Sequence, residues 1–487
     1  MTLALNQLQT LQAHGMHTSA VPLADGDSVV IQQIVRVVPS RRIVCRALWR
    51  GQAVFAKIFL GTRANEYAER DKRGVMHLLA AHIPTPTLLL DAELKEVNGR
   101  ILLLASVDDS DNAENLYQAS DAAERLQLSL SLVEVLAMHH RAGILQTDLY
   151  FKNFLVKDDK VYTIDGDGIR RYAALSNAQM VNNLGVLISK LDVLEEEAWL
   201  KALLEKYRTL NPQVVVDFNQ IKALSKKHRT SATSSYADKK VFRTCTDVQV
   251  HADAQRFFAF ARLFSTLALP QCASDYDAII ERAVMLKSGN TCTVAHAQIS
   301  DTEMVIKRYN VKSLGHFFGR MWRQTRAAAS WSNAHRLQQL GISTPKPIAL
   351  FEQRFFGLRG KAYFLSEYIE APDVAAYFAH ERGSLERAAT IKQLVQLFYR
   401  LYLLRLSHGD TKASNIKIQQ GMPMLIDLDS MKQHSTPFYA AKAHARDLRR
   451  FMQNWKDDTS LYNAFVKSFK VVYADHAPLK QAGILSD

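Results

Sequence analysis

Two segments far apart in this chain of 487 residues carry the same polar residues at the same spacing. They read "TDLYFKNFLVKDDKVYTIDGDG" and "GDTKASNIKIQQGMPMLIDLDS". In each, an asparagine lies five positions after an aspartate, and a second aspartate lies 17 positions after the first aspartate. The residues are Asp148, Asn153 and Asp165 in the first segment, and Asp410, Asn415 and Asp427 in the second. One such pair would be weak evidence, because Asp and Asn are common in loops. Two matching sets indicate that one kind of domain occurs twice.

A lysine within a β-like run precedes each of these segments. Lys57 lies in "QAVFAKIFL" and Lys307 lies in "TEMVIKRYN". A helical pattern follows each lysine, and then a related turn, "IPTP" at 83–86 and "ISTP" at 342–345. The order of lysine strand, helix, proline turn, Asp-x4-Asn loop and acidic strand therefore occurs twice. It predicts an α+β protein of two tandem domains, each with a small β-rich N-lobe and a helical C-lobe.

Composition places the boundary between the two copies. The segment "KKHRTSATSSYADKKVFR", residues 226–243, is polar and has the composition of a linker. We expect a first domain over 1–225, a linker over 226–270 and a second domain over 271–487.

The repeated residue types suit phosphoryl transfer. This chemistry needs a lysine that holds phosphates, oxygen ligands for Mg²⁺ and an aspartate that accepts the proton of the attacking hydroxyl. An aspartate five positions before an asparagine lets one short loop present the base and a metal ligand together. The predicted catalytic bases are Asp148 and Asp410, the phosphate-holding lysines Lys57 and Lys307, and the metal ligands Asn153, Asp165, Asn415 and Asp427.

This arrangement resembles the protein-kinase-like fold, whose catalytic loop reads H-R-D-x-x-x-x-N and whose metal strand reads D-F-G. More narrowly, "HGDTKASNI" with "LIDLDSM", preceded by "VIKRYN" and "LQQLGISTPKP", looks like the bacterial lipopolysaccharide kinase family. The resemblance covers most of 285–455 and, more weakly, 40–190. It implies a two-lobed kinase-like fold, ATP as the donor, and a heptose or Kdo sugar of the lipopolysaccharide inner core as the acceptor.

The first copy departs from the protein-kinase pattern around its phosphate-holding lysine. It has "VPSRRIVC" where a Gly-rich loop would lie, so Arg41 and Arg42 would add positive charge there. Three acidic residues could pair with the lysine from the following helix, namely Glu66, Glu69 and Asp71. We favour Glu69, with the other two left open.

The second copy departs differently, because it has no acidic residue between Glu303 and Glu352 and carries Ser330 at about the expected place. Either Lys307 pairs with Asp427 or this copy is impaired. Yet the second copy keeps "HGD", whereas the first has "QTD". We therefore hypothesise that one copy is catalytic and the other is a substrate-holding or regulatory pseudokinase.

A basic amphipathic pattern in the second copy raises the question of membrane contact. The apolar positions are Leu314, Phe317, Phe318, Met321 and Trp322, with Lys312, Arg320, Arg323 and Arg326 beside them. We favour packing of this stripe on its own β-lobe. The second interpretation is peripheral contact with the anionic inner membrane, where a lipid-linked acceptor would be found.

The function expected from these observations is a cytoplasmic phosphotransferase that depends on ATP and Mg²⁺ and acts on a lipid-linked anionic sugar. A formal net charge of +13 agrees with an anionic partner, and no nucleic-acid motif is present. One alternative is a kinase acting on a protein or small molecule, since fold does not fix the acceptor. The other is a nucleotide-binding pseudokinase scaffold in envelope biogenesis, against which the retention of all four residue types in both copies argues.

Overall fold

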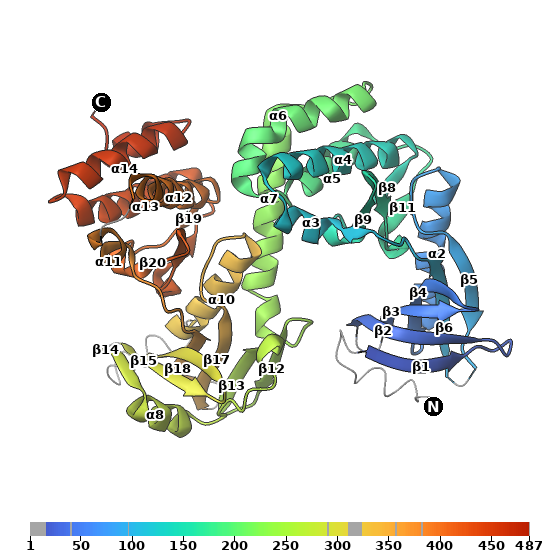
Figure 1. Ribbon diagram of the computed structural model, residues 1–487, viewed down its shortest axis with the longest axis horizontal. Coiled ribbons are helices and arrows are strands. Elements are labelled where there is room, and N and C mark those ends of the chain that lie inside the picture. The colour runs from blue at the N-terminus through green and yellow to red at the C-terminus, as the bar shows by residue number, and fades with distance from the viewer. Residues whose placement is uncertain are drawn as a thin grey trace. The chain divides into compact units, whose positions relative to one another are not determined.

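The protein is described by a computed structural model, which covers residues 16–38, 41–95, 97–289, 292–309, 324–355, 358–380 and 383–486 (Figure 1). The backbone divides into two compact units. The first comprises Met1–Leu191 with Glu195–Arg229, and the second Asp192–Leu194 with Thr230–Asp487. Each combines a sheet with a group of helices, so the predicted mixed α+β class is confirmed.

The sheet of the first unit is antiparallel, with the strand order β1-β2-β3-β4-β6-β5. These strands are β1 (Met16–Pro22), β2 (Ser28–Val38), β3 (Arg42–Trp49), β4 (Gln52–Leu60), β5 (Leu88–Glu93) and β6 (Gly99–Ala105). Along β3, Ile43, Cys45 and Ala47 are buried in the core of this sheet, while Val44 and Arg46 lie on the opposite face. Helix α2 (Ala64–Ala80) connects β4 to β5 and packs on the second face.

The rest of the first unit is mainly helical. Its helices are α3 (Ala113–Ala119), α4 (Ala122–Arg141), α5 (Asn177–Ile188), α6 (Val193–Leu210) and α7 (Phe218–Ala237). Five short strands lie among them: β7 (Asp111–Asn112), β8 (Ile144–Gln146), β9 (Phe154–Lys157), β10 (Lys160–Thr163) and β11 (Ile169–Arg171). Buried residues of α4, α5 and α6, such as Leu136, Leu184 and Leu203, form the core here.

The second unit has a larger antiparallel sheet, in the order β12-β13-β17-β18-β16-β15-β14. Its strands are β12 (Val248–Ala252), β13 (Arg256–Ala261), β14 (Val284–Ser288), β15 (Cys292–Ile299), β16 (Thr302–Tyr309), β17 (Pro347–Phe355) and β18 (Leu358–Glu367). Helix α8 (Ala273–Arg282) precedes β14, and α10 (Arg326–Gln339) lies between β16 and β17.

The segment 226–270 was predicted to be a linker, but it has regular secondary structure. Its first part continues helix α7, and its later part forms β12 and β13, which pair with each other and with β17. The division between the units falls inside α7. A stripe of buried side chains at Ser225, Arg229 and Thr233 gives this helix a packed face, although its composition is polar.

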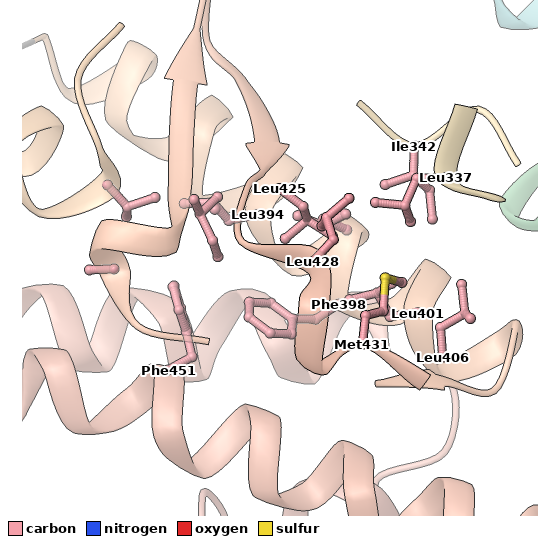
Figure 2. Close-up of a cluster of buried hydrophobic side chains, with 14 of the residues drawn as sticks. Leu337, Ile342, Leu394, Phe398, Leu401, Leu406, Leu425, Leu428, Met431 and Phe451 are labelled. Atoms are coloured by element: carbon pink, nitrogen blue, oxygen red, sulfur yellow. The ribbon is translucent and has the colours of Figure 1, made fainter. Parts of the chain in front are cut away.

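The helices of the second unit are α11 (Val374–Ala379), α12 (Ser384–Leu403), α13 (Pro437–Met452), α14 (Thr459–Val472) and α15 (Ala477–Gln481). Four short strands accompany them: β19 (Leu406–Ser407), β20 (Ile416–Gln419), β21 (Met422–Leu425) and β22 (Lys432–Gln433). Figure 2 shows Leu394, Phe398 and Leu401 of α12 facing Leu425 and Leu428 in the core. This core fixes the loop that begins at Asp427, because Leu428 is buried in it.

The predicted amphipathic stripe at 312–322 lies outside the described residues. Arg326, which was grouped with it, begins α10. Among the described helices, none combines the length and the apolar character that a membrane span requires.

Candidate active site

The acidic strand of each unit ends at an aspartate in a left-handed backbone conformation. Asp165 follows β10 with φ 73° and ψ 79°, and Asp427 follows β21 with φ 61° and ψ 59°. Few residues other than glycine adopt this conformation, and Asp is among those that tolerate it best. A short 3-10 helix then starts at Gly166 or Leu428. The same local geometry thus positions both predicted Mg²⁺ carboxylates.

The Asp-x4-Asn loops also have one geometry. In the first unit, Asn153 Nδ2 donates to the carbonyl oxygen of Asp148 at 2.8 Å and to its Oδ2 at 3.2 Å. In the second, Asn415 Nδ2 makes the corresponding bonds to Asp410 at 2.9 Å and 3.1 Å. The side-chain amide nitrogen of each asparagine therefore donates to the aspartate, which leaves the side-chain carbonyl oxygen, Oδ1, as the acceptor of that side chain.

A backbone hydrogen bond joins this loop to the acidic strand in each unit. The Ile164 N–H donates to the Asn153 carbonyl at 2.9 Å, and the Ile426 N–H donates to the Asn415 carbonyl at 3.0 Å. The short hairpins β9–β10 and β20–β21 span the chain between the bonded residues. The structure thus brings the Asp, the Asn and the second Asp of each predicted set close to one another.

The predicted lysine of the first unit lies in a buried network of ion pairs. Lys57 Nζ contacts Asp71 Oδ1 at 2.9 Å, Asp71 Oδ2 at 2.8 Å and Asp165 Oδ1 at 3.4 Å. Arg42 Nη1 lies 3.3 Å from Asp71 Oδ2 and 3.1 Å from Asp165 Oδ1. Two cations therefore share two carboxylates, and Asp71, Lys57 and Arg42 are all buried.

The prediction that Glu69 pairs with Lys57 is wrong. Glu69 is partly exposed and lies 3.6 Å from Arg100, whereas Asp71 contacts Lys57. Two residues along an α-helix correspond to about 200°, so Glu69 and Asp71 face opposite sides. The buried stripe that includes Ala68 and Val75 continues through Asp71, which is the signal that identifies the correct carboxylate.

The charges of this network shift the pKa values of its carboxyl groups. Burial acts to raise the pKa of Asp165, but Lys57 and Arg42 outweigh it and hold that pKa well below its usual range. Burial raises the pKa of Asp71 despite the same two cations. The two cations therefore favour the ionised form of Asp165 more strongly than that of Asp71.

The second unit has a simpler ion pair. Lys307 Nζ contacts Asp427 Oδ1 at 2.5 Å, so of the two alternatives for this lysine the structure has the pair with Asp427. Burial acts to raise the pKa of Asp427, but Lys307 outweighs it and the pKa is lowered. Ser330 is buried and bonds the Tyr309 hydroxyl at 2.9 Å.

Helix packing supports the correspondence between Ser330 and Asp71. Three residues after Asp71, Gly74 packs against Gly166, where an added Cβ would overlap the carbonyl oxygen. Three residues after Ser330, Asn333 donates to the carbonyl oxygen of Leu428 at 2.9 Å. In both units this helical position thus meets the residue that follows the metal-strand aspartate.

Asp447 of α13 is a residue of the site that sequence analysis missed. Its carboxylate accepts from the backbone N–H groups of His408 at 2.6 Å and Gly409 at 3.0 Å. Its carbonyl oxygen accepts from the Thr411 hydroxyl at 2.5 Å. Asp447 therefore holds the backbone just before Asp410 and the side chain of Thr411 just after it. No local spacing signals it, because it lies 37 residues further along the chain.

Cationic side chains surround Asp410. Lys412 Nζ lies 3.2 Å from its Oδ2, and Arg450 Nε lies 3.7 Å from its Oδ1. A cavity of about 470 Å³ opens at this point. Besides Asp410 its lining includes Lys432, His434, Arg446 and Arg450.

A second cavity, of about 880 Å³, lies in the first unit between the sheet and the Asp-x4-Asn loop. Its apolar lining residues include Val44, Phe55, Leu104, Leu155 and Ile164. The cationic ones are Arg36, Arg42, Arg46, Lys57 and Lys152, and acidic residues at Asp108, Asp109, Asp111 and Glu114 also line it. Asn153 and Asp165 also line it. Predicted cofactor-binding and metal-binding residues of the first unit thus border one cavity.

Comparison with known proteins finds a kinase family that part of the second unit resembles. Residues 282–473 match the model of the lipopolysaccharide kinase (Kdo/WaaP) family, which confirms the resemblance over this part of the chain. The matched region contains Lys307, Asp410, Asn415 and Asp427.

Individual relatives give the same result. A 3-deoxy-D-manno-octulosonic acid kinase of Haemophilus influenzae is 32% identical over 157 residues, which are 28% of this chain and 64% of that protein. A protein of the same name from Actinobacillus succinogenes is 32% identical over 134 residues, 26% of this chain and 55% of that protein. The chain thus spans less than two thirds of the length of these relatives.

Proposed function

We propose that this protein is a kinase that transfers a phosphoryl group from ATP to a sugar hydroxyl of the lipopolysaccharide inner core. Transfer takes place in the second unit. The observation that carries this proposal is the arrangement of Lys307, Asp410, Asn415 and Asp427 within the region that matches the lipopolysaccharide kinase family. The relatives described above are named as kinases of 3-deoxy-D-manno-octulosonic acid, a sugar acid.

Each of these residues has a role in the transfer. Asp410 accepts the proton of the acceptor hydroxyl. The oxygen of that hydroxyl then bonds to the γ-phosphorus of ATP, while the bond from this phosphorus to the bridging oxygen breaks and ADP leaves. Lys307 holds the phosphates of the donor, and Asp447 positions Asp410 through the backbone of His408 and Gly409.

The donor set of the second unit fits Mg²⁺, which prefers carboxylate and amide oxygens. Lys307 contacts Oδ1 of Asp427, and among the described residues no group bonds Oδ2. Asn415 presents its amide nitrogen to Asp410, so its carbonyl oxygen is the remaining ligand atom. Asp427 and Asn415 would hold the ion, which would neutralise charge on the transferred phosphoryl group.

The cavity beside Asp410 supports an acidic acceptor. Lys432, Arg446 and Arg450 line it together with Asp410. A cationic pocket favours an anionic sugar over a neutral one, because guanidinium and ammonium groups bind carboxylates by charge-assisted hydrogen bonds. Kdo carries a carboxylate and a heptose ring does not, so we propose Kdo rather than heptose as the acceptor.

We also propose that the two units are tandem copies of one kinase-like fold. The order lysine strand, helix, proline turn, long helix and Asp-x4-Asn loop occurs in both, and each metal-strand aspartate has the same left-handed backbone. Lys57, Asp148, Asn153 and Asp165 of the first unit correspond to the four residues of the second. The protein would work in the cytoplasm, with peripheral contact with the inner membrane where a lipid-linked acceptor is presented.

Mass spectrometry of a Kdo-bearing lipid A acceptor, incubated with ATP, Mg²⁺ and the full chain, tests this function. We expect a gain of one phosphate that persists in Asp457→Asn, an exposed aspartate of the same unit, and disappears in Asp410→Asn. Asp148→Asn separates the units: persistence of transfer in this variant supports catalysis in the second unit alone. A phosphate gain that survives Asp410→Asn would refute the proposed base.

Steady-state kinetics tests the acceptor pocket. Arg446→Gln should raise the KM for the Kdo-bearing acceptor by about tenfold, the effect of losing one charge-assisted contact. The KM for ATP should stay unchanged. Equal use of acceptors that carry only neutral sugars would contradict the assignment of an acidic acceptor, and absence of any transfer despite ATP binding would favour the pseudokinase scaffold.

A further inference from the structure

The first unit differs from the second at the place where a metal ion would bind. Asp165 is contacted by two cations: Lys57 at 3.4 Å from Oδ1, and Arg42 at 3.1 Å from Oδ1 and 3.5 Å from Oδ2. Both of its oxygens thus face the same guanidinium. A divalent cation at this carboxylate would lie beside two positive charges, and a low-dielectric site strengthens that repulsion.

Strand pairing identifies the residue that replaces Arg42 in the second unit. Val44 pairs with Lys57 across β3 and β4, and Arg42 pairs with Phe59. In β15 and β16, Val294 pairs with Lys307, and Cys292 pairs with Tyr309. Cys292 therefore occupies the position of Arg42. The second unit lacks the guanidinium that covers Asp165, which explains why only one cation contacts Asp427 there among the described residues.

Arg42 also has unused hydrogen-bonding capacity. Its side chain is 8% exposed, and its Nε is buried without a hydrogen-bond partner among the described residues. Arg42 lines the cavity of about 880 Å³. A buried donor without an acceptor is costly unless a ligand supplies one. Arg42 therefore places a second positive charge at the wall of this cavity, beside Lys57.

The rest of this cavity suits a nucleotide. Arg36, Arg42 and Arg46 come from β2 and β3, and their charge can hold phosphates without a Gly-rich loop. Apolar residues of the same cavity, such as Val44 and Leu104, offer surfaces for a base. The lining also includes Asp108, Asp109, Asp111 and Glu114, so the phosphates are assigned to the arginines of β2 and β3. With a cationic part for phosphates and an apolar part for a base, the cavity fits a nucleoside polyphosphate.

We propose that the first unit binds a nucleoside triphosphate without a divalent cation and does not transfer its phosphate. Arg42 and Lys57 supply the positive charge that Mg²⁺ supplies in the second unit. Asn153 and Asp165 were predicted from the sequence as metal ligands. Under this proposal Asn153 holds the loop at Asp148, and Asp165 holds Arg42, instead of a metal ion. The proposal goes beyond the kinase function, because it gives the first unit a separate binding activity.

Calorimetric titration of the full chain with ATP in EDTA tests the metal independence. We expect about one ATP per chain, bound by the first unit. Arg42→Cys, which installs the residue of the second unit, should weaken this binding by about tenfold or more, as expected for loss of charge-assisted bonds to phosphate. Arg46→Gln should weaken it without disturbing the buried ion pairs, because Arg46 is exposed. The control Arg50→Gln, which changes an exposed arginine paired with Asp27, should bind as wild type.

Electron paramagnetic resonance with Mn²⁺ counts the metal directly. With saturating ATP, Asp165→Asn should leave the number of bound Mn²⁺ ions per chain unchanged, whereas Asp427→Asn should lower it. A decrease in Asp165→Asn, or ATP binding in EDTA that Arg42→Cys and Arg46→Gln both leave intact, would overturn the proposal. Neither result depends on sugar phosphorylation, so failure of the kinase proposal would be seen separately in the transfer assay.

Discussion

Replacing Asp447 with asparagine should destabilise the second unit by a calculable amount. Each carboxylate oxygen of Asp447 accepts one backbone N–H, from His408 at 2.6 Å and from Gly409 at 3.0 Å. An asparagine keeps one acceptor and turns an NH₂ group toward the other N–H. One charge-assisted bond is lost and one buried N–H is left without an acceptor, which costs roughly 2–4 kcal/mol.

A compensating effect reduces this cost. Burial raises the pKa of Asp447 despite the hydrogen bonds from His408 and Gly409, so the charged form is partly disfavoured in its site. A neutral amide avoids that cost, and we expect a net loss of about 2 kcal/mol. For a unit of this size, the loss corresponds to a fall in Tm of roughly 4–8 °C.

Calorimetry on the full chain measures this change in the transition of the second unit. The control is Asp457→Asn, because Asp457 is exposed in the same unit and its substitution should shift Tm by less than about 2 °C. The phosphoryl-transfer assay should show a lower kcat with little change in the KM for ATP, since Asp447 acts on the position of Asp410. A Tm of Asp447→Asn equal to that of the control would refute the reasoning.

Three further changes test other parts of the structure. Leu428→Ala should cost about 3 kcal/mol in urea unfolding, because Leu428 fills a buried core. Gly74→Ala should cost roughly 1–3 kcal/mol, since its Cβ would overlap Gly166. Burial lowers the pKa of His140 to about 4, below its unfolded value of 6.5, so the unfolded state binds more protons between these values. Stability should therefore fall, by up to about 3 kcal/mol, as pH drops from 6.5 to 4, and the fall should be smaller in His140→Gln. Equal pH slopes for the two proteins would contradict this assignment.

The clustering of the repeated polar residues could be predicted from the sequence because local structure fixes their positions. A short hairpin joins Asn153 to Asp165, and another joins Asn415 to Asp427, so equal spacing leads to equal geometry. The lysines were identifiable for a related reason, since each lies in a strand of recognisable composition. Their catalytic and metal-binding roles remain proposals.

Other parts of the site depend on contacts that spacing does not encode. The choice between Glu69 and Asp71 depends on the phase of α2, which the buried stripe of that helix would have given. Asp447 reaches the Asp-x4-Asn loop from a helix that lies far along the chain. The role of Arg42 follows from the register between β3 and β4, and one residue of slip would turn Arg42 to the other face of the sheet.

The error over 226–270 has a different origin. The polar composition of this segment is typical of a linker, but Arg229 pairs with Glu196 and Thr233 is buried. Polar side chains that bond to the surrounding protein can line a packed helical face, and composition does not distinguish this from solvent exposure. Tertiary contacts therefore decide the structure of this segment.

The pairing of β13 with β17 sets a lower limit on the fragment that can be studied alone. The family match begins at residue 282, after β12 and β13 have ended. A protein cut there would present the backbone N–H and C=O groups of Leu350, Glu352 and Arg354 along a bare sheet edge. Such edges recruit strands from other molecules. Expression of the matched region by itself should therefore give aggregates, and a fragment intended for crystallisation has to begin before Val248.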